Sequence, residues 1–159
     1  MRWFLVVAVL LLLWVYVRFT YKTPSKVVIL QSSLADFHLK MLLDKQPIVI
    51  QDRVDNIMPV WNGWFKYNYR KSFELTPEME WARNRYKYML IHGKEDGEVM
   101  LCHPNCKKTK GVPDMSEEIV AIKLYKGMSI IVPYRWHIAV SMTEHAMGVH
   151  DLFTYVLPA

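Results

Sequence analysis

The chain has 159 residues, which leaves room for one compact domain. Its 20 lysines and arginines exceed its 15 aspartates and glutamates by five, but no helix or arm concentrates that excess as nucleic-acid-binding proteins do. We therefore expect no nucleic-acid partner, and two cysteines are too few for a disulfide-stapled secreted domain.

The first 21 residues predict a membrane anchor. An unbroken apolar and aromatic run, 3–17, lies between Arg2 and Arg18. As a helix this run spans about 22 Å, less than the roughly 30 Å hydrocarbon core of a bilayer. Snorkelling arginines and interfacial aromatic side chains lengthen the effective span to about 20 residues. The residues expected to hold the helix at the interface are Trp3, Trp14, Tyr16 and Arg18.

Two other interpretations of this run stay open, a cleavable signal peptide and a buried core helix. A signal peptide ends in small residues, whereas this run ends in the bulky, basic sequence WVYVRFTYK, which favours an uncleaved signal-anchor of a single-pass membrane protein. Three cations, Arg18, Lys22 and Lys26, follow the run closely. By the positive-inside rule they favour a cytosolic C-terminal domain.

The rest of the chain divides into a linker, 22–26, and a domain, 27–159. In chain order, the first half of the domain predicts a strand (26–31), an amphipathic helix (33–46), a strand (47–54), an irregular aromatic segment (55–71) and a helix (76–85).

The second half predicts mostly strands. A hairpin (85–93 and 98–104) turns at KEDGE, and a polar loop (105–118) and a strand (118–125) follow. Within 128–140 a first apolar strand ends at Pro133, and a second strand begins at His137. A turn (144–148) and a last strand (149–157) end the chain. The predicted fold class is α+β, mainly β, behind an N-terminal transmembrane helix.

Three motifs in this order resemble the cupin-like and jumonji C-like double-stranded β-helix superfamily. DKQPIVIQDRV resembles the strand behind the family's short leading helix, and YKYMLIHGKEDGEVMLCHP resembles its glycine-containing hairpin. Gly127, Pro133, Trp136 and His137 match its G-x5-P-x2-W-H element. The resemblance implies a small cupin-like β-barrel with one or two helices. Membrane-anchored chains of this kind resemble proteins of large DNA viruses, which implies a virion or host-cell membrane.

The resemblance also implies a place for iron. Oxygenases of the superfamily hold Fe(II) with a His-x-Asp/Glu pair and a later histidine, which leaves coordination positions open for co-substrate and oxygen. His137 matches the later histidine, but the chain contains no His-x-Asp or His-x-Glu pair. We therefore expect no cofactor, no catalytic residue and a binding or structural module. The alternative is an Fe(II)/2-oxoglutarate-type oxygenase in which carboxylates such as Asp52 or Asp55 join His137.

Cys102, His103 and Cys106 form a second candidate site, for zinc or for redox chemistry through a Cys102–Cys106 disulfide; the alternative is that both cysteines are plain free thiols. Zinc prefers these side chains. Neighbouring residues of a strand point to opposite faces, however, so Cys102 and His103 can share one ion only across a bulge.

An aromatic cluster is the candidate surface for a protein partner or for a second contact with the membrane interface. An equal alternative is that it packs over one end of a barrel. Its members are Trp61, Trp64, Phe65, Tyr67 and Tyr69. The expected partners are thus the lipid bilayer, through residues 3–21, and an unidentified protein.

Overall fold

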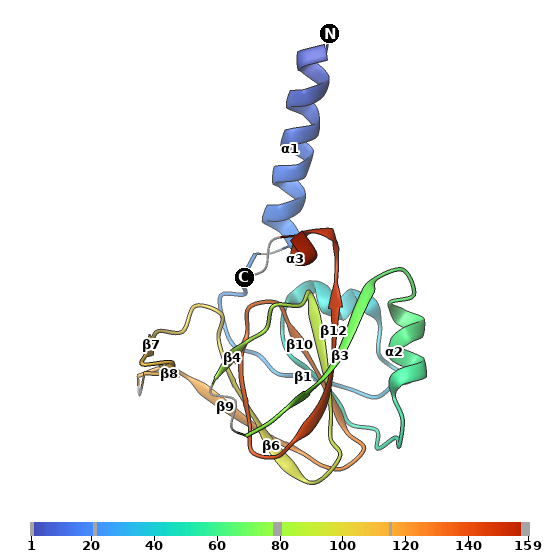
Figure 1. Ribbon diagram of the computed structural model, residues 1–159, viewed down its shortest axis with the longest axis vertical. Helices are drawn as coiled ribbons and strands as arrows, with labels where there is room; N and C mark the ends of the chain where they lie inside the picture. Colours follow the sequence, from blue (N-terminus) through green and yellow to red (C-terminus); the bar gives the residue numbers. More distant parts are fainter. Residues whose placement is uncertain (1, 21, 78–80, 115, 157–159) are drawn as a thin grey trace.

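The structure, a computed structural model, describes residues 2–20, 22–77, 81–114 and 116–156 (Figure 1). Two β-sheets pack face to face beneath a projecting N-terminal helix. The larger sheet has the spatial order β1 (Leu30–Ser32), β2 (Ile48–Ile50), β10 (Ser129–Pro133), β5 (Tyr88–His92), β12 (Glu144–His150), β3 (Tyr69–Leu75). The smaller has the order β4 (Ala82–Arg83), β11 (His137–Val140), β6 (Gly97–Cys102), β9 (Ile119–Leu124). The mainly β prediction is confirmed.

Successive strands cross repeatedly from one sheet to the other. From β3 onward the chain visits the larger sheet, the smaller, the larger, the smaller twice, and then the larger, the smaller and the larger. Between β6 and β9 the chain forms a separate two-stranded ribbon, β7 (Lys108–Thr109) with β8 (Val112–Pro113). Among the described residues no ladder of hydrogen bonds joins the two sheets, so the predicted barrel is an open sandwich.

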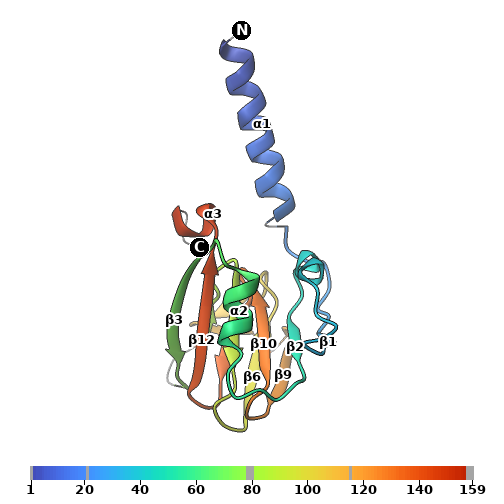
Figure 2. The same ribbon diagram turned by 90° about the vertical axis from the view of Figure 1, so that its right-hand side faces the viewer.

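Two apolar layers hold the sandwich together. The first lies between the sheets and includes Ile91, Leu101, Ile130 and Ile138, all nearly inaccessible to solvent. The second lies on the outer face of the larger sheet, where the 3-10 helix η1 (Leu39–Asp44) and α2 (Met58–Trp64) cover it (Figure 2). Because both of its faces are covered, β5 is buried along its whole length.

The N-terminal helix, α1 (Arg2–Thr20), extends away from the sandwich in both views (Figures 1 and 2). Most of its apolar side chains are exposed, from Phe4 at 85% to Val17 at 36%. That exposure excludes the interpretation as a buried core helix. Within the described residues, no helix combines the length and the apolarity that crossing a membrane requires. The anchor over 1–21, of which residues 1 and 21 lie outside the description, stays a prediction.

Four predictions of local structure were wrong. The amphipathic helix over 33–46 is a turn followed by η1, because the Asp52 carboxylate accepts a hydrogen bond from the Leu34 amide and a turn forms between Ser33 and Asp36. The segment 55–71 contains α2 and the start of β3. The described end of the helix predicted over 76–85 forms β4, and residues 78–80 lie outside the description. The end of the chain is β12 and a short helix, α3 (Leu152–Val156), with residue 157 outside the description.

The predicted hairpin was also wrong in its pairing. Strands β5 and β6 both form, but β5 gives its two edges to β10 and β12, whereas β6 pairs with β11 and β9. No edge of β5 is left for β6. The two strands predicted within 128–140 are confirmed as β10 and β11, and they lie in opposite sheets.

One buried side chain, Asn84, ties two of these crossings together. Its Nδ2 donates to the carbonyls of Val132 (2.9 Å) and Pro133 (2.8 Å), and its Oδ1 accepts from the Tyr86 amide (2.9 Å). Its own amide donates to the Trp136 carbonyl, and its carbonyl accepts from the amide of Arg135, which has the unusual φ of 69°. The β4–β5 link is thereby held against the β10–β11 turn.

We predict that Asn84→Ala destabilises the fold severely. The substitution leaves the Val132 and Pro133 carbonyls buried without their side-chain donor, at a total cost of about 3 kcal/mol. The control is Asn68→Ala, which removes one half-buried bond to the His150 carbonyl and costs about 1 kcal/mol. Urea unfolding of the full chain in mild detergent, followed by tryptophan fluorescence, measures both losses. Equal losses would contradict the role assigned to Asn84.

Candidate binding cleft

A cleft of about 400 Å³ opens at the edge of the sandwich where the sheets end in β3 and β4. Its floor is apolar and consists of Leu75, Met89 and Ile138, which also belong to the layer between the sheets. Side chains of β12 and α3 complete the lining. The cleft is therefore an extension of the sandwich interior toward solvent.

An aromatic wall stands on one side of this cleft. The Tyr86 ring stacks on Phe73, with ring centroids 5.2 Å apart and an interplanar angle of 18°, and the His150 ring lies 4.5 Å from Tyr86. Tyr86 also lies directly on Gly148, where an added Cβ would come within 2.1 Å of the ring. A glycine inside a strand often marks such a close approach. Gly148 is thus the sequence signal that could have pointed to this wall.

Cationic side chains surround the mouth of the cleft. Alternation along β3 places Lys71 and Tyr69 on the same face as Phe73 and Leu75, which is the face turned toward the smaller sheet. Arg85 also lines the cleft, and Arg83 borders it, although Arg83 pairs with His137 across the outer face of the smaller sheet. Among the described residues no aspartate or glutamate lines it, and none of these three cations forms a salt bridge. The described lining is therefore positively charged.

Two pKa shifts reflect how closely these groups approach one another. Burial raises the pKa of the Tyr86 phenol, the Tyr69 phenol adds to the rise, and the Arg85 guanidinium acts against it. Burial lowers the pKa of His150, and the ammonium of Lys71 lowers it further, although Thr154 and Asp151 act in the opposite direction. His150 is therefore neutral at neutral pH, and the charge of the cleft comes from lysine and arginine.

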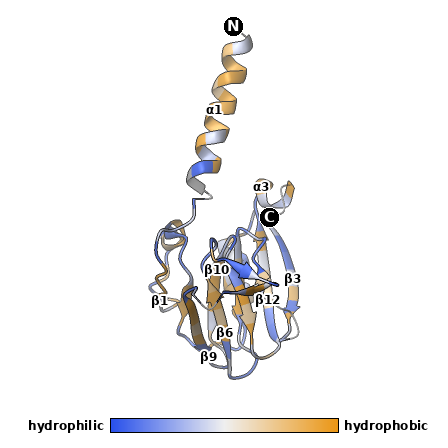
Figure 3. Ribbon diagram, turned by 90° about the vertical axis from the view of Figure 1, so that its left-hand side faces the viewer, coloured by the Kyte–Doolittle hydropathy of each residue, from blue (hydrophilic) through white to orange (hydrophobic). Residues whose placement is uncertain are grey.

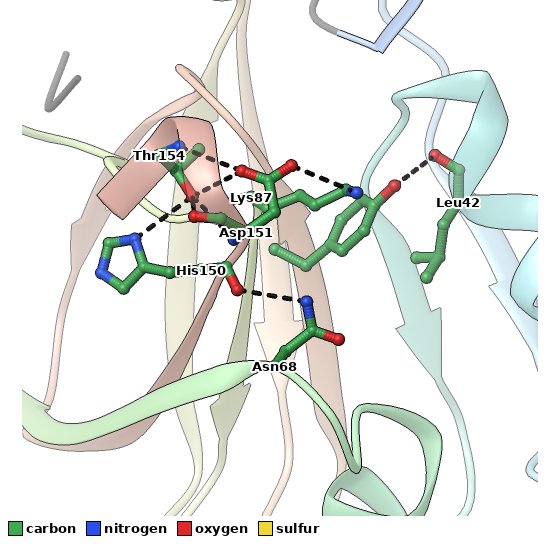
Figure 4. A network of polar contacts seen from close by, with 7 residues as sticks. Leu42, Asn68, Lys87, His150, Asp151 and Thr154 are labelled. Carbon is green, nitrogen blue, oxygen red and sulfur yellow. Dashed lines mark hydrogen bonds and ion pairs between the residues drawn. The ribbon is translucent and has the colours of Figure 1, made fainter. Parts of the chain in front are cut away.

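A network of polar contacts fixes His150 and α3 beside the cleft (Figure 4). Asp151 caps α3 by accepting from the Thr154 amide (3.0 Å), and the Thr154 hydroxyl accepts from the Asp151 amide and contacts His150 Nδ1 (3.2 Å). Lys87 forms a salt bridge with Asp151 at 3.3 Å. The Asn68 side chain donates to the His150 carbonyl (3.1 Å). These contacts hold the His150 ring in place against the aromatic wall.

His137 lies elsewhere, on the outer face of the smaller sheet. In β11, Ile138 and Val140 contact the layer between the sheets, so His137 points away from it. Its cross-strand partners are Arg83 and Cys102. The ring is 6% exposed, and its Nδ1 has no hydrogen-bond partner among the described residues.

The residues around His137 do not fit the iron site that the resemblance implies. Burial lowers the pKa of His137 to about 4, and the cations Lys108 and Arg83 lower it further. Asp52 is engaged with the Leu34 amide, and Asp55 lines a different pocket with His92 and His145. No cluster of three His, Cys, Asp or Glu side chains able to hold a metal ion occurs among the described residues.

The Cys102, His103 and Cys106 group does not fit zinc. His103 Nε2 contacts the Pro24 carbonyl at 2.8 Å, and its Nδ1 accepts from the Asn105 amide at 3.2 Å, so both ring nitrogens are engaged. Both cysteines are free thiols. Burial, together with a hydrogen bond to Cys106, raises the pKa of Cys102 to about 12. A thiol of that kind is a weak ligand and a weak nucleophile.

The predicted aromatic surface is divided between core and solvent. Trp61 and Phe65 are buried between α2 and the larger sheet, and Trp64 packs on Phe37 with ring centroids 4.3 Å apart. These three side chains therefore belong to the hydrophobic core. Only Tyr67 and Tyr69, at 93% and 58% exposed, remain open to a partner. They line a second hollow, of about 450 Å³, that adjoins the cleft at Tyr69, His150 and Tyr155.

The cleft was not foreseen from the sequence, apart from Tyr69. No protein-family model, no curated protein and no solved structure matches the chain. What the cleft can do chemically is therefore argued from its own side chains.

We predict that His137 makes the fold acid-sensitive. In the unfolded chain the pKa of His137 is about 6.5, whereas in the folded chain it is about 4. The unfolded state therefore gains protons first, and stability falls between these two values by at most about 3 kcal/mol. Urea unfolding at a series of pH values should show a shallower fall for His137→Gln. The control His38→Gln, at an exposed site, should keep the wild-type fall, and identical curves for both variants would contradict the assignment.

We predict unequal reactivity of the two thiols. Cys102 is buried and holds its proton, so its thiolate is scarce at pH 8, whereas Cys106 is half-exposed. In the folded chain, iodoacetamide should modify the single thiol of Cys102→Ser rapidly and that of Cys106→Ser slowly, with the difference lost in denaturant. Equal rates under native conditions would rule out the buried environment of Cys102.

Proposed function

We propose that this chain is a single-pass membrane-anchored, non-catalytic binding module whose sandwich is a degenerate cupin-like double-stranded β-helix. The observation that supports a membrane anchor is the exposed apolar surface of α1. Figure 3 colours most of the helix hydrophobic, with a hydrophilic segment at its C-terminal end. An exposed apolar surface of this kind marks a site of interaction with a partner or a membrane. For a helix that is apolar on all sides, the surroundings that bury every face are the lipid chains of a bilayer.

Although no described helix meets the length and apolarity needed to cross a membrane, we place α1 in the bilayer because its length falls only slightly short of the hydrocarbon core. Its 19 residues extend about 28 Å, close to the roughly 30 Å hydrocarbon core. Arg18 lies over the Trp14 ring, 5.2 Å from its centroid, which is a combination favoured at the membrane interface.

The end of the sandwich next to α1 also suits a membrane surface. Helix α3 lies near the base of α1 in both ribbon views, and Tyr16 contacts Phe153 with ring centroids 5.4 Å apart (Figures 1 and 2). Leu152, Tyr155 and Val156 of α3 are exposed by more than half. Apolar and aromatic side chains of this kind favour the interfacial layer of a bilayer.

Strand order supports the cupin-like part of the proposal. The four-strand runs β3-β12-β5-β10 and β4-β11-β6-β9 have the order of a jelly roll, in which the chain crosses between the sheets at every step except β6 to β9. Cupins share this architecture. The Gly127 φ of 84° and the completely buried Trp136 are consistent with structural roles for the G-x5-P-x2-W-H element. Through the resemblance to viral chains, the proposed site of action is a virion or host-cell membrane, with the sandwich on the cytosolic side.

We predict that Leu11→Asp releases the chain from membranes. An aspartate at the centre of an inserted helix costs about 3 kcal/mol, so partitioning should fall by roughly a hundredfold. Flotation of the full chain with liposomes in a density gradient measures the change. Leu43→Asp, at an exposed leucine of η1, is the matched control and should still float. Flotation of both variants, or of neither, would contradict a role for α1 as the anchor.

A further inference from the structure

The cleft between β3 and β4 has three kinds of surface in a fixed arrangement. The floor is apolar, one wall is aromatic, and the cations lie at the mouth. We propose that this cleft binds a small organic anion that carries a flat ring, of the aryl carboxylate class. This inference deepens the binding role proposed above and rests on it, but it does not depend on the anchor.

The size and surface of the cleft set the shape of the ligand. A volume of about 400 Å³ lies within the roughly 300–1,000 Å³ typical of small-molecule sites. Phe73 and Tyr86 are stacked against each other, and Gly148 leaves the space that the Tyr86 ring occupies, because a Cβ at that position would collide with the ring. A flat ring can pack beside this stack and over Met89 and Ile138, because aromatic groups prefer stacked or edge contacts with one another.

The charges at the mouth set the sign of the ligand. Lys71 and Arg85 line the cleft, and their effects on the pKa values of His150 and Tyr86 show that both cations act at the aromatic wall. Neither cation has an ion-pair partner among the described residues. The nearest acid along β12 and α3, Asp151, is already engaged by Lys87 and Thr154. A carboxylate on the ligand would supply the missing negative charge.

The arrangement also sets the direction in which the ligand lies. The floor residues belong to the sealed layer between the sheets, whereas Lys71 and Arg85 are exposed. The ring therefore points inward and the carboxylate outward. At the mouth the carboxylate can accept hydrogen bonds from the lysine, the arginine and the phenol of Tyr69.

Equilibrium dialysis of the full chain in lipid nanodiscs, with empty nanodiscs as the blank, tests the inference. The probes are 2-naphthoate, its neutral isostere 2-naphthamide, the flexible acid decanoate and inorganic phosphate. We expect one site for 2-naphthoate, at least about tenfold tighter than for any other probe, which corresponds to 1.4 kcal/mol.

Two variants locate the site. Lys71→Met and Arg85→Met should each weaken 2-naphthoate binding by about threefold to tenfold, the range for partly exposed charge-assisted contacts. Both side chains are exposed, so neither substitution should unfold the chain. Lys123→Met, on the exposed side of β9 and away from the cleft, is the matched control and should leave binding unchanged.

Each remaining outcome overturns the inference. Equal binding of 2-naphthamide would show that the cleft does not select an anion, tighter binding of decanoate would show that it does not select a flat ring, and unchanged binding in both Met variants would place the site elsewhere. Absence of binding by all four probes would also overturn it. Flotation with liposomes is measured separately, so none of these results is confused with failure of the anchor.

Discussion

Asn84 makes its hydrogen bonds at the point where the chain passes between the two sheets. It joins the link that leads into β5 to the turn that leads out of β10, and these two strands are neighbours at the centre of the larger sheet. A loop in this position would otherwise bury several backbone groups without partners, which a folded protein avoids. With its amide satisfied on both sides, Asn84 fixes the two crossings relative to each other. Arg85 and Tyr86 follow it directly, so the same contacts also place one cation and the aromatic wall of the cleft.

The cleft exists because the sandwich is open along one edge. Strand β3 has seven residues, whereas β4, at the corresponding edge of the smaller sheet, has two. Among the described strands, none of the smaller sheet therefore lies opposite the inner face of β3 near Tyr69 and Lys71. In a closed barrel these positions would face other side chains and would favour apolar residues. Here they are free to carry a phenol and a cation over an apolar floor, which is the composition of a binding site.

Alternation along β11 decides the role of His137. Because side chains of a strand point alternately to the two faces, a shift of one residue exchanges the interior position for the exterior one. Ile138 takes the interior position and forms part of the cleft floor, while His137 lies outside with Arg83, Cys102 and Lys108 nearby. A histidine that motif matching assigns to a metal site is thus a buried neutral side chain in a cationic environment.

The sequence by itself determined the apolar N-terminal helix and most of the strands, including β10 and β11 on either side of the turn after Pro133. These elements depend on local periodicity and on glycine and proline backbone preferences. It failed where pairing overrides local preference. The turn predicted at 144–148 became a strand because β3 and β5 pair with it on both sides, and the KEDGE hairpin separated because β5 has no free edge. Only the tertiary structure brought Lys71, Arg85, Tyr86 and His150 together. They come from separate elements, and no local pattern records which faces of those elements meet.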